Sequence, residues 1–528
     1  MSIRFLRVFG RIILVGAIAL QVALLGVSRT MAEEPLVHGP PKLRVASARF
    51  GVAPEPGPML NTSSGHAVTE VRGPIETTVT LLDDGAQRVC LIANDFGGTN
   101  HNVSRLFRRV IGKELGIPPS HVVIFSSHNH SSFMLVRNGT NPYGMPPYDP
   151  SEAELLPIGQ EYLSQLCQTA RALVERLEPV TVWWAVGQED RITYHRKGRR
   201  ANGTSFFMRE EDRILQGTDY RGDIDTQAPV VVFKNAAGKP VAAWAQFTGH
   251  PVTSYHPEKP VVFGDWPQVA CDHLAKQLGG ENVPVGFLQG CAGDVNSKEM
   301  FRGGVRRATE FGEMLGQSYV DALPQLKQSS RDGFDFVPTT ADLPLAPLPG
   351  KAELIRELAE IDEFIRRGNA GDETALDCVG LNFPSDLTPK YRAWLVERIR
   401  PWTEWALAQH ESGKANGVPK TMPIELWVLR VGDVGIVGMP CEPFQGIGRQ
   451  MRSGSKLPLT IPCGYANYSK GYITDGANTG DREYMSSFYR YTAGSGSNPR
   501  PPLGKPAGDA IAEKAVQVLN QMAGASDE

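Results

Sequence analysis

The chain has 528 residues, of which 41% are hydrophobic and 21% charged, so it can bury a full globular core. Its formal net charge is −3 and no basic stripe runs along it, which excludes a nucleic-acid surface built on phosphate contacts. Seven scattered cysteines without a C-x-x-C pair exclude a small disulfide framework, and their odd number leaves at least one thiol unpaired.

The first 32 residues are typical of an export signal. Arg4, Arg7 and Arg11 precede an apolar run from Ile12 to Val27, and Ala32 ends a plausible cleavage site. The run is short for a membrane-spanning helix, so residues 1–32 predict a signal peptide, with an uncleaved N-terminal membrane anchor as the alternative. Cleavage leaves 50 basic and 57 acidic residues, a net charge of −7, in a secreted or periplasmic protein.

The residues that follow predict an α/β fold. Residues 33–60 are rich in proline and are expected to form a loop. A hairpin of strands at 78–82 and 88–93 comes next, then a helix at 103–115 and a buried strand at 122–125. Strand, helix and strand within about fifty residues are typical of a βαβ unit.

The second half of the chain repeats this mixture and adds a helical segment. The pattern predicts these elements: a helix at 159–177, a hairpin ending at His250, a strand before "GCAGDVNS", a helix near 305–322, a hairpin ending at Glu442, and a last helix near 508–522. Residues 341–420 carry charged amphipathic helices. We therefore expect a mixed sheet core with surrounding helices, and 341–420 as a helical insertion or lid.

Four polar stretches follow apolar strands, and each carries a side chain able to bind a metal. They are "SSHNHSS" with His128 and His130, "FTGHPVTS" with His250, "GMPCEPF" with Glu442, and "YANYSKGYITDG" with Tyr472. Ligands gather beyond the carboxyl ends of strands in α/β sheets, and imidazole with carboxylate suits zinc. Each stretch alone also fits a solvated loop or a satisfied core residue.

Together these stretches resemble the neutral/alkaline non-lysosomal ceramidases in order and approximate spacing, over roughly residues 41–490. "DDGAQRVCLIANDFGG" with "FSSHNHSS" is similar to the family's "DLGG" and "HTHSGPGG" region. The other matching stretches are "FTGHPVTSYH" with "FGDWPQ", "FLQGCAGDVNSK", "VGDVGIVGMPCEPF", and "YSKGYITDG" with "REYMSSFY".

The resemblance implies a zinc hydrolase domain over 33–528. It implies that Zn²⁺ is held by a set of four ligands, His128, His250, Glu442 and Tyr472. It implies that His130 contacts the scissile carbonyl, that Arg196 assists, and that Tyr489 assists from late in the tyrosine block. Asn296 stands where the family has a serine, and Phe263 and Gly264 precede Asp265 where the family has another, so a metal-activated water fits this chain better than a serine nucleophile. Few residues follow Tyr489, so the family's C-terminal immunoglobulin-like domain is not expected.

The resulting hypothesis is a zinc-dependent amidohydrolase acting on ceramide or another N-acyl amine, with peripheral membrane contact possible. An esterase or lactonase on the same site, and a catalytically silent zinc-containing envelope protein, are the alternatives. The acids Asp475 and Asp481 beside Tyr472 are expected to face the substrate, which favours an amide smaller or more polar than ceramide. The tryptophans of the helical segment, Trp394, Trp402 and Trp405, are expected to pack within it rather than to line a pocket.

Overall fold

The computed structural model describes residues 43–55, 59–98, 101–136, 154–201, 205–280, 283–479, 490 and 499–524. The chain divides into two compact units, Met1–Pro40 and Pro41–Glu528, and every described residue lies in the second. The predicted signal peptide and Tyr489 lie outside the described residues. Within the described ranges, none of the helices has the length and apolar character needed to cross a bilayer.

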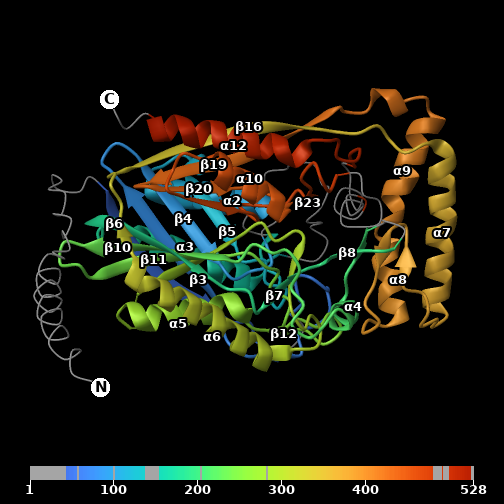
Figure 1. Ribbon diagram of the computed structural model, residues 1–528, viewed down its shortest axis with the longest axis horizontal. Helices are drawn as coiled ribbons and strands as arrows, with labels where there is room; N and C mark the ends of the chain where they lie inside the picture. Colours follow the sequence, from blue (N-terminus) through green and yellow to red (C-terminus); the bar gives the residue numbers. More distant parts are fainter. Residues whose placement is uncertain are drawn as a thin grey trace, which may run out of the picture. The chain divides into compact units, whose positions relative to one another are not determined.

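A nine-stranded mixed sheet organises the core (Figure 1). In spatial order the strands are β13 (Val285–Gln289), β11 (Pro240–Phe247), β10 (Gln227–Asn235), β6 (Glu178–Gln188), β1 (Arg44–Val52), β3 (Ile75–Asp83), β4 (Arg88–Asn94) and β5 (Val122–Ser126), with β15 (Lys327–Gln328) beside β6. The pairs β11–β13 and β4–β5, at the two ends of the sheet, are parallel, and the other neighbouring strands are antiparallel.

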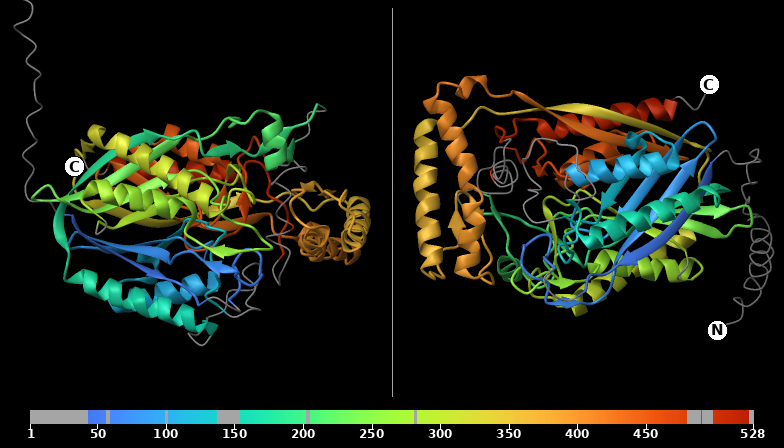
Figure 2. Two further views of the ribbon diagram at one scale, coloured as in Figure 1. Left: turned by 90° about the horizontal axis from the view of Figure 1, so that it is seen from below. Right: turned by 180° about the vertical axis from the view of Figure 1, so that it is seen from behind.

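Helices cover the outer faces of the two halves of this sheet, and the inner faces pack on one another (Figure 2). Helices α2 (His101–Leu115) and α3 (Pro157–Val174) cover β1, β3, β4 and β5, while α5 (Asp265–Leu278) and α6 (Gly304–Ala322) cover β10, β11 and β13. Strand alternation explains the layering. Val230 and Val232 face α5 and α6, whereas Val231 and Phe233 join the central core.

A second, four-stranded sheet extends this core. Its strands in order are β16 (Phe334–Pro344), β19 (Thr421–Val431), β20 (Val434–Gly438) and β22 (Leu459–Cys463). One face contributes Trp427, Leu429 and Ile436 to the central core. The other face packs against α10 (Gln445–Gly454) and α12 (Ala507–Gly524) through Ile447 and Leu519. Both faces are therefore apolar, as the continuous hydrophobic run of β20 requires.

The expected helical insertion is confirmed. Helices α7 (Lys351–Asn369), α8 (Pro389–Glu397) and α9 (Arg400–Glu411) lie side by side beyond the sheets (Figures 1 and 2). Trp402 is fully buried and packs with Leu354 and Ala406 of the same segment, as expected, while its indole Nε1 donates to the Arg500 carbonyl outside the segment at 2.9 Å. Trp394 stacks on Tyr391 in the same segment.

Five short strand pairs and a six-residue helix are further described elements outside the two large sheets. They are β2 (Glu70–Val71) with β12 (Val261–Val262), β7 (Thr193–His195) with β14 (Val295–Ser297), β8 (Lys197–Arg199) with β9 (Ser205–Phe207), β17 (Asp377–Cys378) with β18 (Leu381–Asn382), β21 (Glu442–Pro443) with β23 (Tyr472–Ile473), and helix α4 (Glu210–Leu215).

The α/β class is confirmed, and so are the β3–β4 hairpin and the β4–α2–β5 unit with its parallel strands. The loop expected at 33–60 is wrong for Arg44–Val52, which forms β1 and pairs with β3 along its whole length. Its alanines, glycine, serine and arginines give a weak apolar signal, and its place inside the sheet comes from its neighbours rather than its composition. The sequence pattern also missed β6 and β16.

Candidate metal centre

Two histidines beyond strand ends present the same ring nitrogen to one point. His128 follows β5 by two residues, and its Nδ1 lies 2.8 Å from the Gly97 carbonyl oxygen. His250 follows β11 by three residues, and its Nδ1 lies 2.7 Å from the Ala292 carbonyl oxygen. A carbonyl oxygen only accepts, so each Nδ1 carries the proton. In each neutral ring the lone pair is therefore on Nε2.

The carboxylate of Glu442 lies in contact with both Nε2 atoms. Its Oε2 lies 3.3 Å from His128 Nε2 and 3.2 Å from His250 Nε2, and the residue is 4% exposed. Burial, followed by the positive charge of Arg196, lowers the pKa of His250 to about 4, so this ring is neutral at pH 7. The Nε2 lone pair of the neutral His250 ring thus faces the carboxylate oxygen, and His128 Nε2 lies at nearly the same distance from that oxygen.

This donor set fits a cation. Three lone-pair donors converging in a buried space repel one another, and a metal ion at their centre turns the repulsion into coordination. Zinc–nitrogen bonds of about 2.0–2.1 Å place tetrahedral ligand atoms about 3.3 Å apart, which matches the two Nε2–Oε2 distances given above. The Nδ1–carbonyl hydrogen bonds are those that metal-ligating histidines make to fix ring orientation.

His130 stands beside the first histidine. Its Nε2 lies 3.3 Å from His128 Nε2, and the available ligand atoms of His128, His130 and His250 all lie within 4.8 Å of one another. This is a group of residues that could hold a metal ion. Burial, followed by the neighbouring imidazoles of His128 and His250, lowers the pKa of His130 well below its ordinary value. His130 is therefore neutral as well.

Tyr472 and Arg196 complete the predicted group. Tyr472 pairs with Glu442 in the β21–β23 ladder, so both side chains leave the backbone at the same level. Arg196, 4% exposed, donates from Nη2 to the Tyr472 hydroxyl oxygen at 3.1 Å. Burial, and then the Glu442 carboxylate, raise the pKa of Tyr472 well above its ordinary value. The structure thus brings together His128, His130, Arg196, His250, Glu442 and Tyr472, and Tyr489 lies outside the described residues.

Asn296 occupies a structural position beside these residues. Its Oδ1 accepts from Arg196 Nη1 at 2.9 Å, and its backbone bridges to His250. Phe263 borders the histidine loop, because its carbonyl oxygen accepts from Asn129 Nδ2 at 2.7 Å. Asn296 and Phe263 therefore support neighbours of the centre, and neither supplies a nucleophile.

Gln289 is a residue that the sequence reasoning missed. It ends β13, is fully buried, and its Nε2 donates to the Ser127 carbonyl at 2.7 Å and to the Gly249 carbonyl at 2.8 Å. These carbonyls belong to the residues directly before His128 and His250. One carboxamide thus fixes both histidine loops relative to each other. A polar residue closing the apolar strand "VGFLQ" was the available signal.

Tyr465 was missed too. Its ring stacks on that of His128, with centroids 4.2 Å apart and an interplanar angle of 26°. It is 3% exposed, and burial, followed by the Glu442 and Tyr472 charges, raises its pKa well above the ordinary value. Several tyrosines crowd this part of the sequence, and no spacing rule distinguishes Tyr465 from the others.

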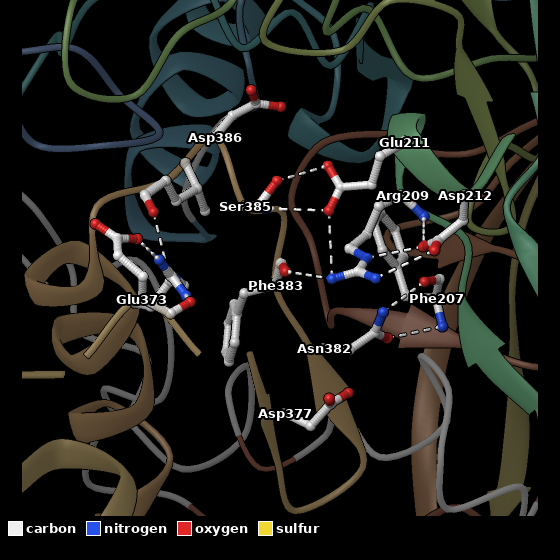
Figure 3. A network of polar contacts seen from close by, with 12 residues as sticks. Phe207, Arg209, Glu211, Asp212, Glu373, Asp377, Asn382, Phe383, Ser385 and Asp386 are labelled. Carbon is white, nitrogen blue, oxygen red and sulfur yellow. Dashed lines mark hydrogen bonds and ion pairs between the residues drawn. The ribbon is translucent and has the colours of Figure 1, made fainter. Parts of the chain in front are cut away.

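The helical insertion contacts strand β9 through Asn382 and Phe207 (Figure 3). The Asn382 carboxamide accepts from the Phe207 amide at 2.9 Å and donates to the Phe207 carbonyl at 2.7 Å. The Phe207 ring lies 5.4 Å from the Arg196 guanidinium and packs in a small apolar cluster with Tyr472. Nearby, Glu211 accepts from the Ser385 amide and hydroxyl, which ties α4 to the same loop of the insertion.

The acids expected to face substrate do not all do so. Asp475 is 4% exposed, and its carboxylate accepts from the Ala477 amide and from Asn478 Nδ2 within its own turn. The expectation that Asp475 faces a substrate is therefore wrong, because the carboxylate stabilises the turn after β23. Asp481 lies outside the described residues.

All seven cysteines are described and none forms a disulfide. Six of them are buried, including Cys441 directly before Glu442. The absence of a disulfide among the described cysteines agrees with the unpaired thiol that the odd count predicted.

The fold resembles that of solved protein structures. No model of a known protein family matches the sequence, and no curated protein sequence matches it. Solved structures do match, among them neutral ceramidase from Pseudomonas aeruginosa at 17% identity and a TM-score of 0.58, and a ceramidase complexed with C2 at 16% identity and a TM-score of 0.60. Each alignment covers 92% of this chain, with 75% of the first ceramidase and 76% of the second. The chain has a neutral ceramidase-like fold, as the sequence resemblance implied.

Proposed function

We propose that this protein is a zinc-dependent amidohydrolase that cleaves ceramide or another N-acyl amine. The observation that carries the proposal is the convergence of two histidine Nε2 atoms on one carboxylate oxygen at 3.2–3.3 Å within a neutral ceramidase-like fold. His128, His250 and Glu442 would hold the metal, with Tyr472 as the fourth ligand. Bound zinc would polarise the amide carbonyl and lower the pKa of a water molecule to about 7.

The chain's own residues supply the remaining chemistry. His130 lies against the ligand group, and its imidazole would contact the carbonyl oxygen of the substrate. Arg196 brings a buried positive charge to Tyr472, which favours negative charge there. Protonation of the departing amine requires an acid, and His130 or Tyr489 would provide it. Water adds to the carbonyl carbon, the C–N bond breaks, and the products are a carboxylic acid and an amine.

Support for the substrate class comes from the two structural neighbours, both of which are ceramidases by name. The Asp475 carboxylate is buried in its own turn and so adds less polar surface beside Tyr472 than the sequence predicted. The argument for a substrate smaller or more polar than ceramide is weaker for this reason. Long-chain ceramide and short N-acyl amines are both retained as substrates to be compared.

The test combines metal content with turnover. Purified wild type should contain about one zinc per chain and hydrolyse an N-acyl amine, whereas His250→Ala should lose both properties. Asn296→Ala is the matched control: the Asn296 side chain contacts Arg196 rather than a ligand side chain, and its backbone bridge to His250 is kept, so the variant should keep its zinc. Hydrolysis of esters alone would indicate the esterase alternative, and zinc without any turnover would indicate a silent envelope protein. Wild type without bound transition metal would refute the proposal.

We also propose that residues 1–32 direct export and are removed. The basic residues and apolar run described above support this assignment. N-terminal sequencing of the mature protein should begin at Glu33. A mature chain that still begins at residue 1 or 2 would indicate a membrane anchor instead.

A further inference from the structure

Tyr465 has a strained backbone conformation, and it is hydrogen-bonded to the segment before Glu442 and to the strand before His128. Its φ is 58°, in the left-handed region that bulky side chains rarely adopt. Its amide donates to the Cys441 carbonyl at 2.9 Å, and its carbonyl accepts from the Ser126 amide at 3.4 Å. Cys441 directly precedes Glu442, and Ser126 ends the strand that leads to His128. Strain that is maintained by ligand-bearing segments points to a role in the site.

The Tyr465 ring faces the ligands. It stacks on His128 at 4.2 Å and stands edge-on to His250, with centroids 6.1 Å apart. His128 itself has a φ of 64°, so two strained residues from distant parts of the chain lie in contact. Stacking alone would be served equally well by phenylalanine, and therefore does not explain a hydroxyl group at this position.

The Tyr465 hydroxyl makes no hydrogen bond with any of the described residues, although it is buried. The ring contacts with His128 and His250 place this side chain beside the candidate ligands. A buried hydroxyl without a partner is unfavourable, and such groups persist where a ligand or water completes them. At neutral pH a phenol carries its proton and can donate it to an oxygen.

We propose that Tyr465 is a further catalytic residue whose phenol donates a hydrogen bond to the carbonyl oxygen of a substrate held beside His128, His250 and Glu442. The inference rests on the proposed function, because it assigns the ligand as an acyl carbonyl. The donor strengthens its bond as negative charge develops on that oxygen, which is the requirement for stabilising a tetrahedral intermediate.

Tyr465→Phe tests this, because it deletes the hydroxyl and keeps the stacked ring. The variant should bind about one zinc per chain and melt at or above the wild-type temperature, since no hydrogen bond among the described residues is lost. Its kcat/KM for the N-acyl amine should fall at least tenfold. Tyr468→Phe is the matched control, since Tyr468 is buried in the same loop and stacks on His101, while its hydroxyl lies 2.9 Å from Glu425. This control should lose stability and keep its kcat/KM.

Acetohydroxamate, which offers a carbonyl oxygen to a bound metal, gives a readout that is independent of turnover. It should raise the melting temperature of zinc-loaded wild type and of Tyr468→Phe, with at least tenfold weaker binding to Tyr465→Phe. Unchanged hydroxamate affinity in Tyr465→Phe, loss of its zinc, or failure of hydroxamate to bind wild type would each overturn the inference. If the protein hydrolyses no amide but Tyr465→Phe still binds hydroxamate at least tenfold more weakly than wild type, the proposed substrate is refuted. The role of Tyr465 as a hydrogen-bond donor would then still stand.

Discussion

His250 Nε2 lies 3.2 Å from Glu442 Oε2, and neither atom carries a proton when the ring donates through Nδ1 and the acid is ionised. His128 Nε2 lies 3.3 Å from the same carboxylate oxygen. A lone-pair contact such as that of His250 opposes folding unless a cation lies between the two atoms. A cation bound at this group would therefore stabilise the folded protein relative to the metal-free state.

Glu442→Gln separates these two states. The new amide group can donate to both Nε2 atoms, so the metal-free variant should be more stable than metal-free wild type by about 1–3 kcal/mol. Its zinc affinity should fall at least a hundredfold, because a neutral amide is a poor zinc ligand. Denaturation with and without a chelator, together with zinc titration, measures both effects. A metal-free variant less stable than wild type would contradict the lone-pair account.

Gln289→Leu tests the shared support of the histidine loops. Two buried carbonyls lose their donor, and removal of a support outside the ligand set typically costs tenfold to a hundredfold in metal affinity. Gln246→Leu is the control, since Gln246 is equally buried on the neighbouring strand and donates to Thr248. Both variants should melt earlier, and Gln289→Leu alone should bind zinc more weakly. Equal zinc affinity in the two variants would show that the Gln289 bonds serve stability only.

Asn382→Leu tests the link between the helical insertion and Arg196. Loss of both bonds to Phe207 should loosen β9, so that Arg196 holds Tyr472 less firmly and kcat/KM falls about tenfold, an effect of about 1.4 kcal/mol. Hydrogen exchange should show faster exchange of the Phe207 amide. Ser385→Ala, which removes a hydroxyl contact with Glu211 only, should leave both readouts unchanged. Rapid exchange at Phe207 with full activity would disprove the coupling.

Asp95→Asn should stabilise the protein more at pH 8 than at pH 5. Burial raises the pKa of Asp95 to about 7, so between pH 4 and 7 the folded state holds a proton that the unfolded state has released. The free energy of unfolding of wild type therefore falls as the pH rises through this window. Asparagine does not ionise, so the variant should not lose this contribution, which is of order 2 kcal/mol. Urea unfolding of both proteins at the two pH values measures the difference.

Asp83→Asn provides the control of opposite sign. Burial opposes ionisation of Asp83, yet its hydrogen bonds with Arg44 and Arg88 hold its pKa below the ordinary value. Its stabilisation is present above the unfolded pKa and is lost as the pH falls through the folded pKa. At pH 7 the free energy of unfolding of Asp83→Asn should be lower than that of wild type, and this difference should disappear at acidic pH. An Asp95→Asn effect that does not change between pH 5 and 8 would refute the assignment of a raised pKa.

The sequence predicted those features that depend on short stretches of the chain, such as a polar residue directly after an apolar strand. His128, His250, Glu442 and Tyr472 were singled out because each stretch that carries them follows an apolar strand, and the family resemblance added Arg196 and the expected roles. Strand β1 was missed because its small and charged residues become a strand only between β3 and β6. Gln289 and Tyr465 were missed because their roles depend on contacts with Ser127, Gly249 and His128, which lie far away in sequence.

The most direct test of the central claim is an anomalous difference map at the zinc absorption edge, collected from crystals of the purified protein. The account predicts one strong peak per chain, about 2 Å from His128 Nε2, His250 Nε2 and Glu442 Oε2. No peak, or a peak bound elsewhere while these three atoms keep their present spacing, would contradict a zinc centre at this position.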